Sequence, residues 1–251
     1  MQEIVAGLWR IPLAAGSVNA YLWQGGDGLT LVDCGYAGSG QHILRLLSQA
    51  GHTAQDVRRI VITHGDFDHV GGLAALRTAT GAAVLAHSQE VAFIEGQRPR
   101  CWGPTPAGQL LAWGDWLRAS MRLSYIEPVR VDRPLADGEV LDGGWQVVHT
   151  PGHTPGHIAL YHPRWQVLIA GDLLSQRRGR PIGPVPAYAV DMKQAAASLR
   201  RLAALEPRIL CFGHRRPLTV DQPQALYDLA RYLEERYRSD DHRQRGARRR
   251  T

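Results

Sequence analysis

Short apolar runs alternate with glycine-rich turns along the first forty residues of the chain. Runs of β-branched and aromatic residues that are bounded by turn residues are typical of strands. Such runs lie at residues 4–5, 8–11, 19–23 and 29–33. The pattern therefore predicts a β-meander at the start of the chain.

Helical and strand patterns alternate in the next part of the chain. Apolar positions with a helical period predict a helix from about 40 to 50, which Gly51 ends. A β-branched strand at 60–63, a short helix at about 71–80 and a strand at 83–86 follow. We interpret this part as α/β in character.

Strand patterns return in the second half at 145–148, 158–161, 167–170 and 209–212, and helical patterns run to about 205 and from 222 to about 238. Asp191, followed three residues later by Gln194, is a helix-start signature. We therefore assign Asp191 to capping and not to chemistry.

The segment from about 88 to 134 has helical patterns and an unusual density of aromatic residues. We interpret it as an insertion, because it is too short to bury a core of its own. An aromatic flap over a cleft can build an apolar pocket, so Trp102, Trp113 and Trp116 are candidates to line a substrate pocket. The alternative is that these side chains only pack the insertion against the body.

The composition is that of a globular protein, with 44% hydrophobic residues in 251. We expect one domain over residues 1–238 and a disordered basic tail over 239–251. The three cysteines are widely spaced and odd in number, which predicts neither a disulfide framework nor a thiolate zinc site. Cys34 and Cys211 lie in apolar runs and are expected in the core.

The chain has no apolar run of about 18 residues. Its N-terminus lacks the basic start and apolar segment of a signal peptide, so we expect a cytoplasmic protein that does not bind a membrane. The formal net charge is +6, of which five charges come from the tail arginines 243, 245, 248, 249 and 250, leaving +1 elsewhere. A nearly neutral body disfavours a specific nucleic-acid partner.

Four potential metal ligands lie within six residues, directly after the strand at 60–63. In extended chain, residues i and i+2 face the same way, so His64 and Asp66 would face one metal ion, while Asp68 and His69 could serve a second. Imidazole and carboxylate ligands suit zinc, iron or manganese. The alternative is that Asp66 or Asp68 caps the next helix and that the histidines are ordinary surface residues.

Three later turns repeat this feature, a histidine or an aspartate directly after a strand. They are the PGHTPGH sequence from Pro151 to His157, Gly171-Asp172 and Gly213-His214. Four such places in one chain favour a shared metal site over coincidence.

These four motifs, in this order, resemble those of the metallo-β-lactamase superfamily. The segment from Leu31 to Gly35 also looks like that family's strand before the first helix, and the resemblance extends from about Ile4 to Tyr237. It implies an α+β fold, a four-layer αββα sandwich in which two mixed sheets pack face to face with the metal ions at one edge.

The resemblance also implies a cofactor of two divalent metal ions, with zinc as the first choice. It assigns the first metal ion to His64, Asp66 and His153, the second to Asp68, His69 and His214, and a bridging position to Asp172. Asp33 and His157 would support these ligands from behind.

One position departs from the family, which usually has histidine where this chain has Asp66. An aspartate oxygen lies about as far from the backbone as the nearer ring nitrogen, so the substitution can preserve coordination. It also adds negative charge, which favours harder ions such as Mn²⁺ or Fe²⁺. A weakened first site would instead leave a mononuclear enzyme or a metal-binding protein.

The resemblance implies hydrolysis of a small ester, lactone or thioester by a metal-bound hydroxide. Asp68 would be the catalytic residue that orients the water or passes its proton to the leaving group. An iron-dependent oxidoreductase is the alternative, because the flavodiiron branch has a carboxylate at the position of Asp66. The expected partner is a small-molecule substrate, and a homodimer is possible because these folds often dimerise.

Overall fold

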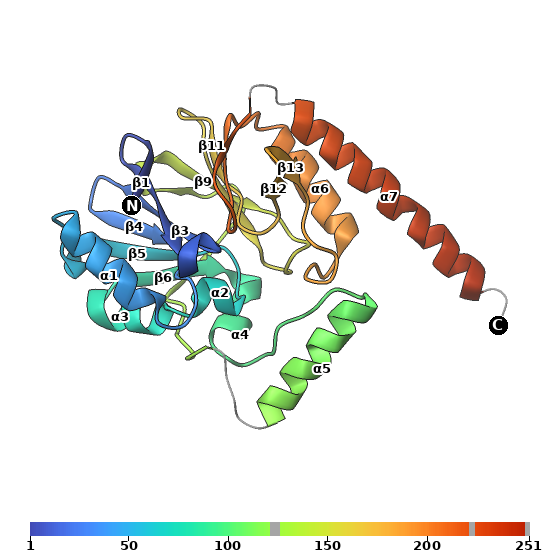
Figure 1. The fold of residues 1–251 in the computed structure, drawn as a ribbon, viewed down its shortest axis with the longest axis horizontal. Helices are drawn as coiled ribbons and strands as arrows, with labels where there is room; N and C mark the ends of the chain where they lie inside the picture. Colours follow the sequence, from blue (N-terminus) through green and yellow to red (C-terminus); the bar gives the residue numbers. More distant parts are fainter. Residues whose placement is uncertain (121–125, 221–223, 249–251) are drawn as a thin grey trace.

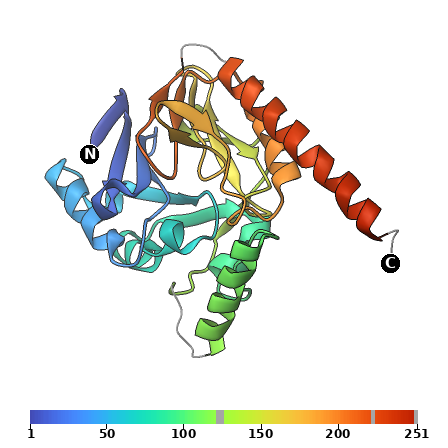
Figure 2. The same ribbon diagram turned by 45° about the vertical axis from the view of Figure 1, so that its right-hand side comes forward.

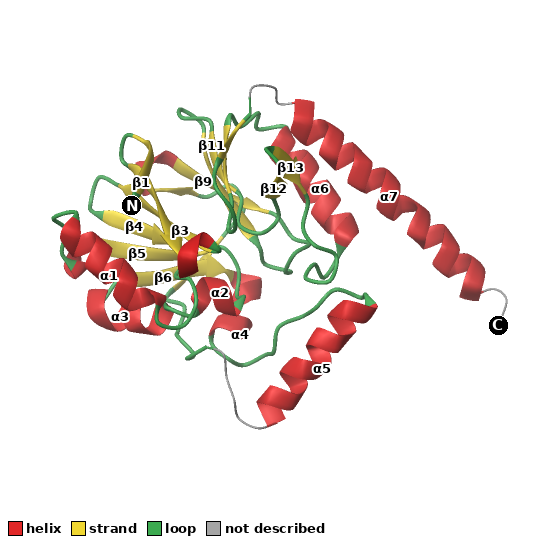
Figure 3. Ribbon diagram, viewed as in Figure 1, coloured by secondary structure: helices red, strands yellow, loops and turns green. Residues whose placement is uncertain are grey.

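Two β-sheets pack face to face between layers of helices in the computed structural model, which describes residues 1–120, 126–220 and 224–248 (Figure 1). Figure 3 shows the strands grouped in the middle of the molecule and the helices outside them. The N-terminus lies on the first sheet, and the C-terminal helix runs along the far side of the second (Figure 1).

The first sheet takes its strands in chain order. They are β1 (Gln2–Val5), β2 (Leu8–Leu13), β3 (Val18–Gln24), β4 (Leu29–Val32), β5 (Val57–Ile62), β6 (Ala83–His87) and β7 (Arg133–Leu135). Strands β1 to β4 form the predicted antiparallel meander, and β4 to β7 are parallel. Helices α1 (Ser39–Gln49) and α3 (Leu73–Thr80) lie in the connections between the parallel strands, as parallel pairing requires.

The second sheet has the order β15-β14-β11-β10-β9-β8. Its strands are β8 (Val140–Leu141), β9 (Trp145–His149), β10 (Ile158–His162), β11 (Val167–Ile169), β14 (Ile209–Cys211) and β15 (Leu218–Thr219). Helices α6 (Met192–Ala203) and α7 (Gln224–Arg248) pack on its outer face. A separate hairpin, β12 (Ser175–Arg177) and β13 (Arg180–Ile182), stands beside this sheet.

Alternation of side chains along the strands produces the layers. In β5, Ile60 and Ile62 pack with residues of α1 and α3, whereas Val61 packs with residues of the second sheet. Between the sheets, the rings of Trp23 and Trp145 stack with their centroids 5.1 Å apart. The predicted four-layer αββα sandwich is confirmed.

Local signals located the longer elements well. Oδ1 of Asp191 accepts hydrogen bonds from the backbone N–H groups of Lys193 and Gln194, so the predicted cap of α6 is confirmed. Cys34 and Cys211 are both fully buried, as predicted. Some strands were not predicted because they have only two or three residues each and are too short to show a period. They are β7, β8, β12, β13 and β15.

The insertion is narrower than the expected 88–134. Helix α4 (Val91–Ile94) contributes Ile94 to the hydrophobic core between the first sheet and helices α1 and α3. Val129 and Val131 are buried in the same core. Strand β7 then pairs with β6, so both ends of the segment belong to the body. The part that stands away from the body is helix α5 (Pro106–Ser120) (Figures 1 and 2).

The basic tail also differs from the expectation. Helix α7 continues past the predicted end at about 238 to Arg248, and the last three residues, 249–251, lie outside the described part. Arginine, glutamine and alanine have good helix propensity, so the existing helix can extend through this sequence. Among the described helices, none combines the length and the apolar character that a bilayer crossing needs.

The loops that carry the candidate ligands meet at one edge of the sandwich, and a buried carboxylate ties two of them together. Glu90 is fully buried and accepts from the backbone N–H of Gly65 at 2.7 Å through Oε2. Its Oε1 accepts from Oγ1 of Thr154 at 2.7 Å and from the N–H of Gly156 at 2.8 Å. Burial raises the pKa of Glu90, while these donors act in the opposite direction.

Substituting Glu90→Gln should lower the free energy of unfolding by roughly 1–3 kcal/mol, because the amide NH₂ would face a buried donor that then has no acceptor. Chemical denaturation measures this change. Glu127→Gln is the matched control, since Glu127 is exposed, and should stay within about 0.5 kcal/mol of the parent. A Glu90→Gln protein as stable as the parent would show that the two loops do not depend on this carboxylate.

Candidate metal centre

The structure brings all the predicted metal ligands together at this edge. They form three groups, in each of which the ligand atoms lie within 4.8 Å of one another: His64 with Asp66 and His153, His64 with His69 and Asp172, and Asp68 with His69 and His214. The ligands come from loops after β5, β11 and β14 and from the turn between β9 and β10. Strands β11 and β14 are parallel neighbours, so the loops that follow them lie at the same end of the second sheet.

The first group contains the ligands expected for one metal ion. Oδ2 of Asp66 lies 3.6 Å from Nε2 of His64 and 3.1 Å from Nε2 of His153. Two ligand atoms at 2.0–2.1 Å from a tetrahedral zinc ion lie roughly 3.3–3.4 Å apart. The spacing therefore fits a metal ion between these three side chains.

The second group is spaced in the same way, and Asp172 lies between the two groups. Nε2 of His214 is 3.3 Å from Oδ2 of Asp68 and 3.1 Å from Oδ2 of Asp172. The carboxylate of Asp172 also lies 3.4 Å from Nε2 of His69 and 3.9 Å from Nε2 of His153. It can therefore contact an ion in either group.

Buried polar atoms without hydrogen-bond partners point into this space. Nε2 of His64, Nε2 of His69 and Oδ1 of Asp172 are all buried and unsatisfied within the described residues. An unsatisfied buried polar atom is costly, and a bound ion removes that cost. The donor set, nitrogen and carboxylate oxygen, suits zinc, iron or manganese.

Asp33 stands behind ligands of both groups, where the sequence analysis placed it. Its Oδ2 accepts from Nδ1–H of His69 and from the hydroxyl of Thr63, both at 2.8 Å. Since that hydroxyl donates to Asp33, it accepts from Nδ1–H of His64 at 2.9 Å. Both histidines are thereby set to present Nε2 to the centre.

His157 also lies behind the ligands. Its Nε2 accepts from the backbone N–H of Asp172 at 3.1 Å, and its Nδ1–H donates to Oγ1 of Thr150 at 2.8 Å. Burial and the neighbouring His64 lower the pKa of His157 well below its usual range, so the ring is neutral. It holds the loop of Asp172 and is not itself grouped with the ligands.

The helix-cap alternative for the 64–69 stretch is wrong. Asp66 does occupy the N-cap position of the short helix α2 (Phe67–Val70), but its side chain makes no capping hydrogen bond. His64 and His69 are fully buried and are not surface residues. Asp68, in the first turn of α2, lies with its carboxylate toward His214.

Arg100 is the residue of this centre that the sequence analysis missed. Its Nε and one terminal nitrogen donate to the two oxygens of Asp66, both at 2.6 Å, in a bidentate pair. The same terminal nitrogen donates to the carbonyl of Tyr188 at 2.8 Å. Both charged side chains are about nine-tenths buried, with 10% and 9% exposed.

This pair corrects the expectation that Asp66 makes the centre more negative. The guanidinium of Arg100 balances the charge of Asp66, so the pair together is as neutral as the usual histidine. A signal for it was available, because a carboxylate at a buried position needs a nearby cation.

The ionised carboxylates at the centre favour a cation between the ligands. Burial opposes ionisation of Asp66, but Arg100 and His64 hold its pKa well below the usual range. The pKa of Asp172 is likewise held well below its usual range, against burial, chiefly by His69. Against burial, Asp172 and Asp68 raise the pKa of His214 to about 10. The same carboxylates would attract a metal ion.

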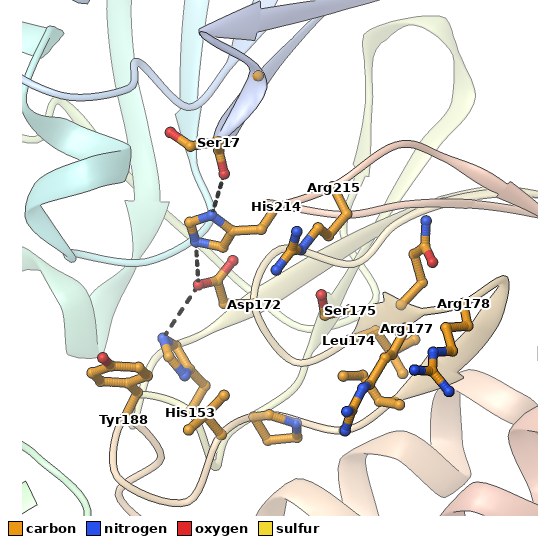
Figure 4. Close-up of a pocket in the computed structure, with 16 residues that line it drawn as sticks. Ser17, His153, Asp172, Leu174, Ser175, Arg177, Arg178, Tyr188, His214 and Arg215 are labelled. Atoms are coloured by element: carbon orange, nitrogen blue, oxygen red, sulfur yellow. Dashed lines mark hydrogen bonds and ion pairs between the residues drawn. The ribbon is translucent and has the colours of Figure 1, made fainter. Parts of the chain in front are cut away.

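A cavity of about 670 Å³ opens onto the centre, but it is not lined as predicted. His153, Asp172 and His214 form one part of its wall, and residues 174–178 and 182–185 form another (Figure 4). Trp102 is absent from this lining and packs instead beside Arg100 and Tyr188. Trp113 is 59% exposed on α5, and the side chain of Trp116 lies outside the described part. Trp102 and Trp113 therefore do not line this cavity.

Among the known proteins that this chain resembles are two that are named as hydrolases. The probable metallo-hydrolase YflN of Bacillus subtilis (strain 168) is 31% identical over 205 residues, which are 75% of this chain and 76% of that protein. The hydroxyacylglutathione hydrolase of Pseudomonas aeruginosa (strain LESB58) is 35% identical over 169 residues, 64% of this chain but only 49% of that enzyme.

A solved structure, that of TTHA1623 in a di-iron-bound form, superposes with a TM-score of 0.65 at 32% identity and covers 84% of this chain and 94% of its own. The family model described as the metallo-beta-lactamase superfamily matches residues 13–214. That match spans most of the chain and includes every candidate ligand. The chain therefore belongs to the metallo-β-lactamase superfamily.

Proposed function

We propose that this protein is a dinuclear metal-dependent hydrolase of small esters, lactones or thioesters. The proposal rests on two groups of potential metal ligands that lie on either side of Asp172. Buried nitrogen and oxygen atoms without hydrogen-bond partners among the described residues face the space between them. Two divalent metal ions held there would polarise a substrate carbonyl and lower the pKa of bound water to about 7.

The residues divide as the resemblance implies. His64, Asp66 and His153 would hold one ion, Asp68, His69 and His214 the other, and Asp172 would contact both. Zinc is the expected ion, and manganese and iron are the alternatives. Because Arg100 neutralises Asp66, the aspartate does not by itself argue for a harder ion.

Asp68 is the proposed catalytic residue. Burial opposes its ionisation, but His214 and His69 lower the pKa of Asp68, so it is a carboxylate at neutral pH. Its side chain is 14% exposed at the centre, next to His214 and Asp172. It can therefore accept a proton from the attacking water and deliver it to the leaving group.

One relative supports the type of reaction, and another supports a class of substrate. YflN is named a probable metallo-hydrolase, which supports the reaction type. The hydroxyacylglutathione hydrolase supports a thioester among the candidate substrates, although this chain spans about half of that enzyme.

Iron-dependent oxidation is the second candidate, favoured by one observation. The structural neighbour TTHA1623 was solved in a di-iron-bound form, so this fold can hold two iron ions. Iron-loaded protein that consumes oxygen with a thiol substrate would support this candidate over hydrolysis.

Metal analysis and turnover together test the proposal. Protein purified without added metal should contain close to two divalent ions per chain, and the same sample should hydrolyse members of an ester, lactone and thioester panel. His214→Ala, which removes a ligand of the second group, should lower both the metal content and turnover. Protein without transition metal, on which zinc, manganese and iron restore no activity, would overturn the proposal.

The substitution Arg100→Ala tests whether the positive charge of Arg100 weakens metal binding at the first position. The apo protein should be destabilised by about 3–5 kcal/mol, because buried Asp66 loses its partner. Added metal should then stabilise the variant more than the parent, since no guanidinium opposes the ion. Thermal denaturation with and without zinc measures both effects.

Arg98→Ala, an exposed arginine in the same loop, is the control and should behave like the parent. If Arg100→Ala instead lost metal from the first position, Arg100 would orient the carboxylate for the ion and would not compete with it.

A further inference from the structure

The cavity beside the metal centre has a basic side. Figure 4 shows His153 and Asp172 at one side of the cavity, Arg177 and Arg178 at the other, and Arg215 next to His214. Arg177 and Arg178 belong to the β12–β13 hairpin and its turn, and Arg215 follows directly on a candidate ligand.

These three arginines have no acidic partner among the described residues. Other arginines of the molecule pair with carboxylates, such as Arg59 with Asp27 and Arg201 with Asp137. The acidic residue of the cavity lining is Asp172, which faces His69 and His214. The arginine charges at the cavity are therefore available to a ligand.

Arg215 is held in its position by the fold. Its φ is 73°, in the left-handed region that side chains other than glycine rarely adopt. The buried amide of Asn19 fixes this conformation, donating to the carbonyls of Arg215 at 2.6 Å and Phe212 at 2.9 Å. Nε of Arg10 donates to Oδ1 of Asn19 at 2.8 Å, so the amide cannot be reversed. Strain maintained in this way at a site edge suggests a role in binding.

The hairpin that carries the other two arginines is also anchored. Arg178 and Gly179 both have positive φ, 54° and 75°, which gives a tight turn between β12 and β13. After β13, Gly183 lies so close to Leu233 of α7 that a Cβ would stand 2.6 Å from Cδ1 of that leucine. The hairpin is therefore anchored against α7 at the end of β13, and Arg178 of its tight turn lines the cavity.

Apolar side chains line the cavity as well. They are Leu174, Ile182, Pro184, Val185 and Tyr188. Val185 and Tyr188 are 52% and 45% exposed, which is high for large apolar residues and leaves their surfaces free for contact with a ligand. The volume, about 670 Å³, suits a small molecule and not a polymer.

We propose that the substrate carries a carboxylate or a phosphate at the end away from its reacting carbonyl, and that Arg177, Arg178 and Arg215 bind this group. This inference rests on the proposed hydrolase function and adds the class of substrate. In this proposal a short apolar linker joins the two ends of the substrate and lies against Ile182, Val185 and Tyr188. Guanidinium groups bind both anions through paired N–H donors, so the two share one recognition chemistry.

A matched pair of esters tests the proposal. The mono-4-nitrophenyl ester of glutaric acid and 4-nitrophenyl pentanoate have the same leaving group and acyl length, and only the first has a terminal carboxylate. Metal-loaded protein should show a kcat/KM about tenfold or more higher for the anionic ester, and this ratio should fall as salt is added.

The double variant Arg177→Ala/Arg215→Ala should bring the ratio toward one by raising KM for the anionic ester. Arg45→Ala, which removes an exposed arginine from α1, should leave the ratio at the parent value. A ratio near one in the parent, or a high ratio that survives the double variant, would overturn the inference.

Binding measurements separate failure of this inference from failure of the hydrolase proposal. Calorimetric titration of metal-loaded protein with glutarate and with inorganic phosphate distinguishes the two anions, and the stronger should bind the double variant at least about tenfold more weakly than the parent. If neither ester is hydrolysed but this difference is found, the anion site stands and the hydrolase proposal fails. If the parent and the double variant bind both anions equally, the arginine site is wrong.

Discussion

The hydrogen bonds of one buried carboxylate, that of Asp33, hold the candidate metal centre in order. Asp33 accepts from the backbone and the hydroxyl of Thr63 and from the ring of His69. Through the hydroxyl of Thr63 it also sets the ring of His64. One ligand of each group thus depends on the same side chain, which has a left-handed backbone with φ of 59°. The two groups cannot be oriented independently.

Charge balance is the second constraint on the centre. Asp66, Asp68 and Asp172 lie close together with a cluster of histidines, and nearby positive groups are required to keep the carboxylates ionised in a buried place. Arg100 supplies one such group beside Asp66. In this chain, the aspartate at position 66 and the guanidinium of Arg100 therefore form one charge-balanced unit.

Local sequence patterns predicted the longer strands and helices and the ligand turns, because these are local in origin, whereas the sandwich was implied by the resemblance to the superfamily. A β-branched run followed by a ligand-rich turn, as at 60–69, shows its character within ten residues. Glu90 and Arg100 show no comparable local pattern, because their partners lie 25 to 66 positions away in the chain. The signal available for Arg100 was indirect, since it came from the carboxylate of Asp66 and not from the sequence around Arg100. The arginine side of the cavity was missed for a related reason, since strands of three residues such as β12 and β13 have no period to detect.

The placement of the ligands on the two sheets has a mechanical consequence. His64 and Asp66 follow a strand of the first sheet, whereas His153 lies in a turn of the second, and His69 and His214 are divided in the same way. An ion bound in either group would cross-link the two halves of the sandwich at one end. Because the intact sandwich alone presents both sets of ligands, binding energy would be added to the cohesion between sheets. Metal supply would then determine how cooperatively the halves unfold.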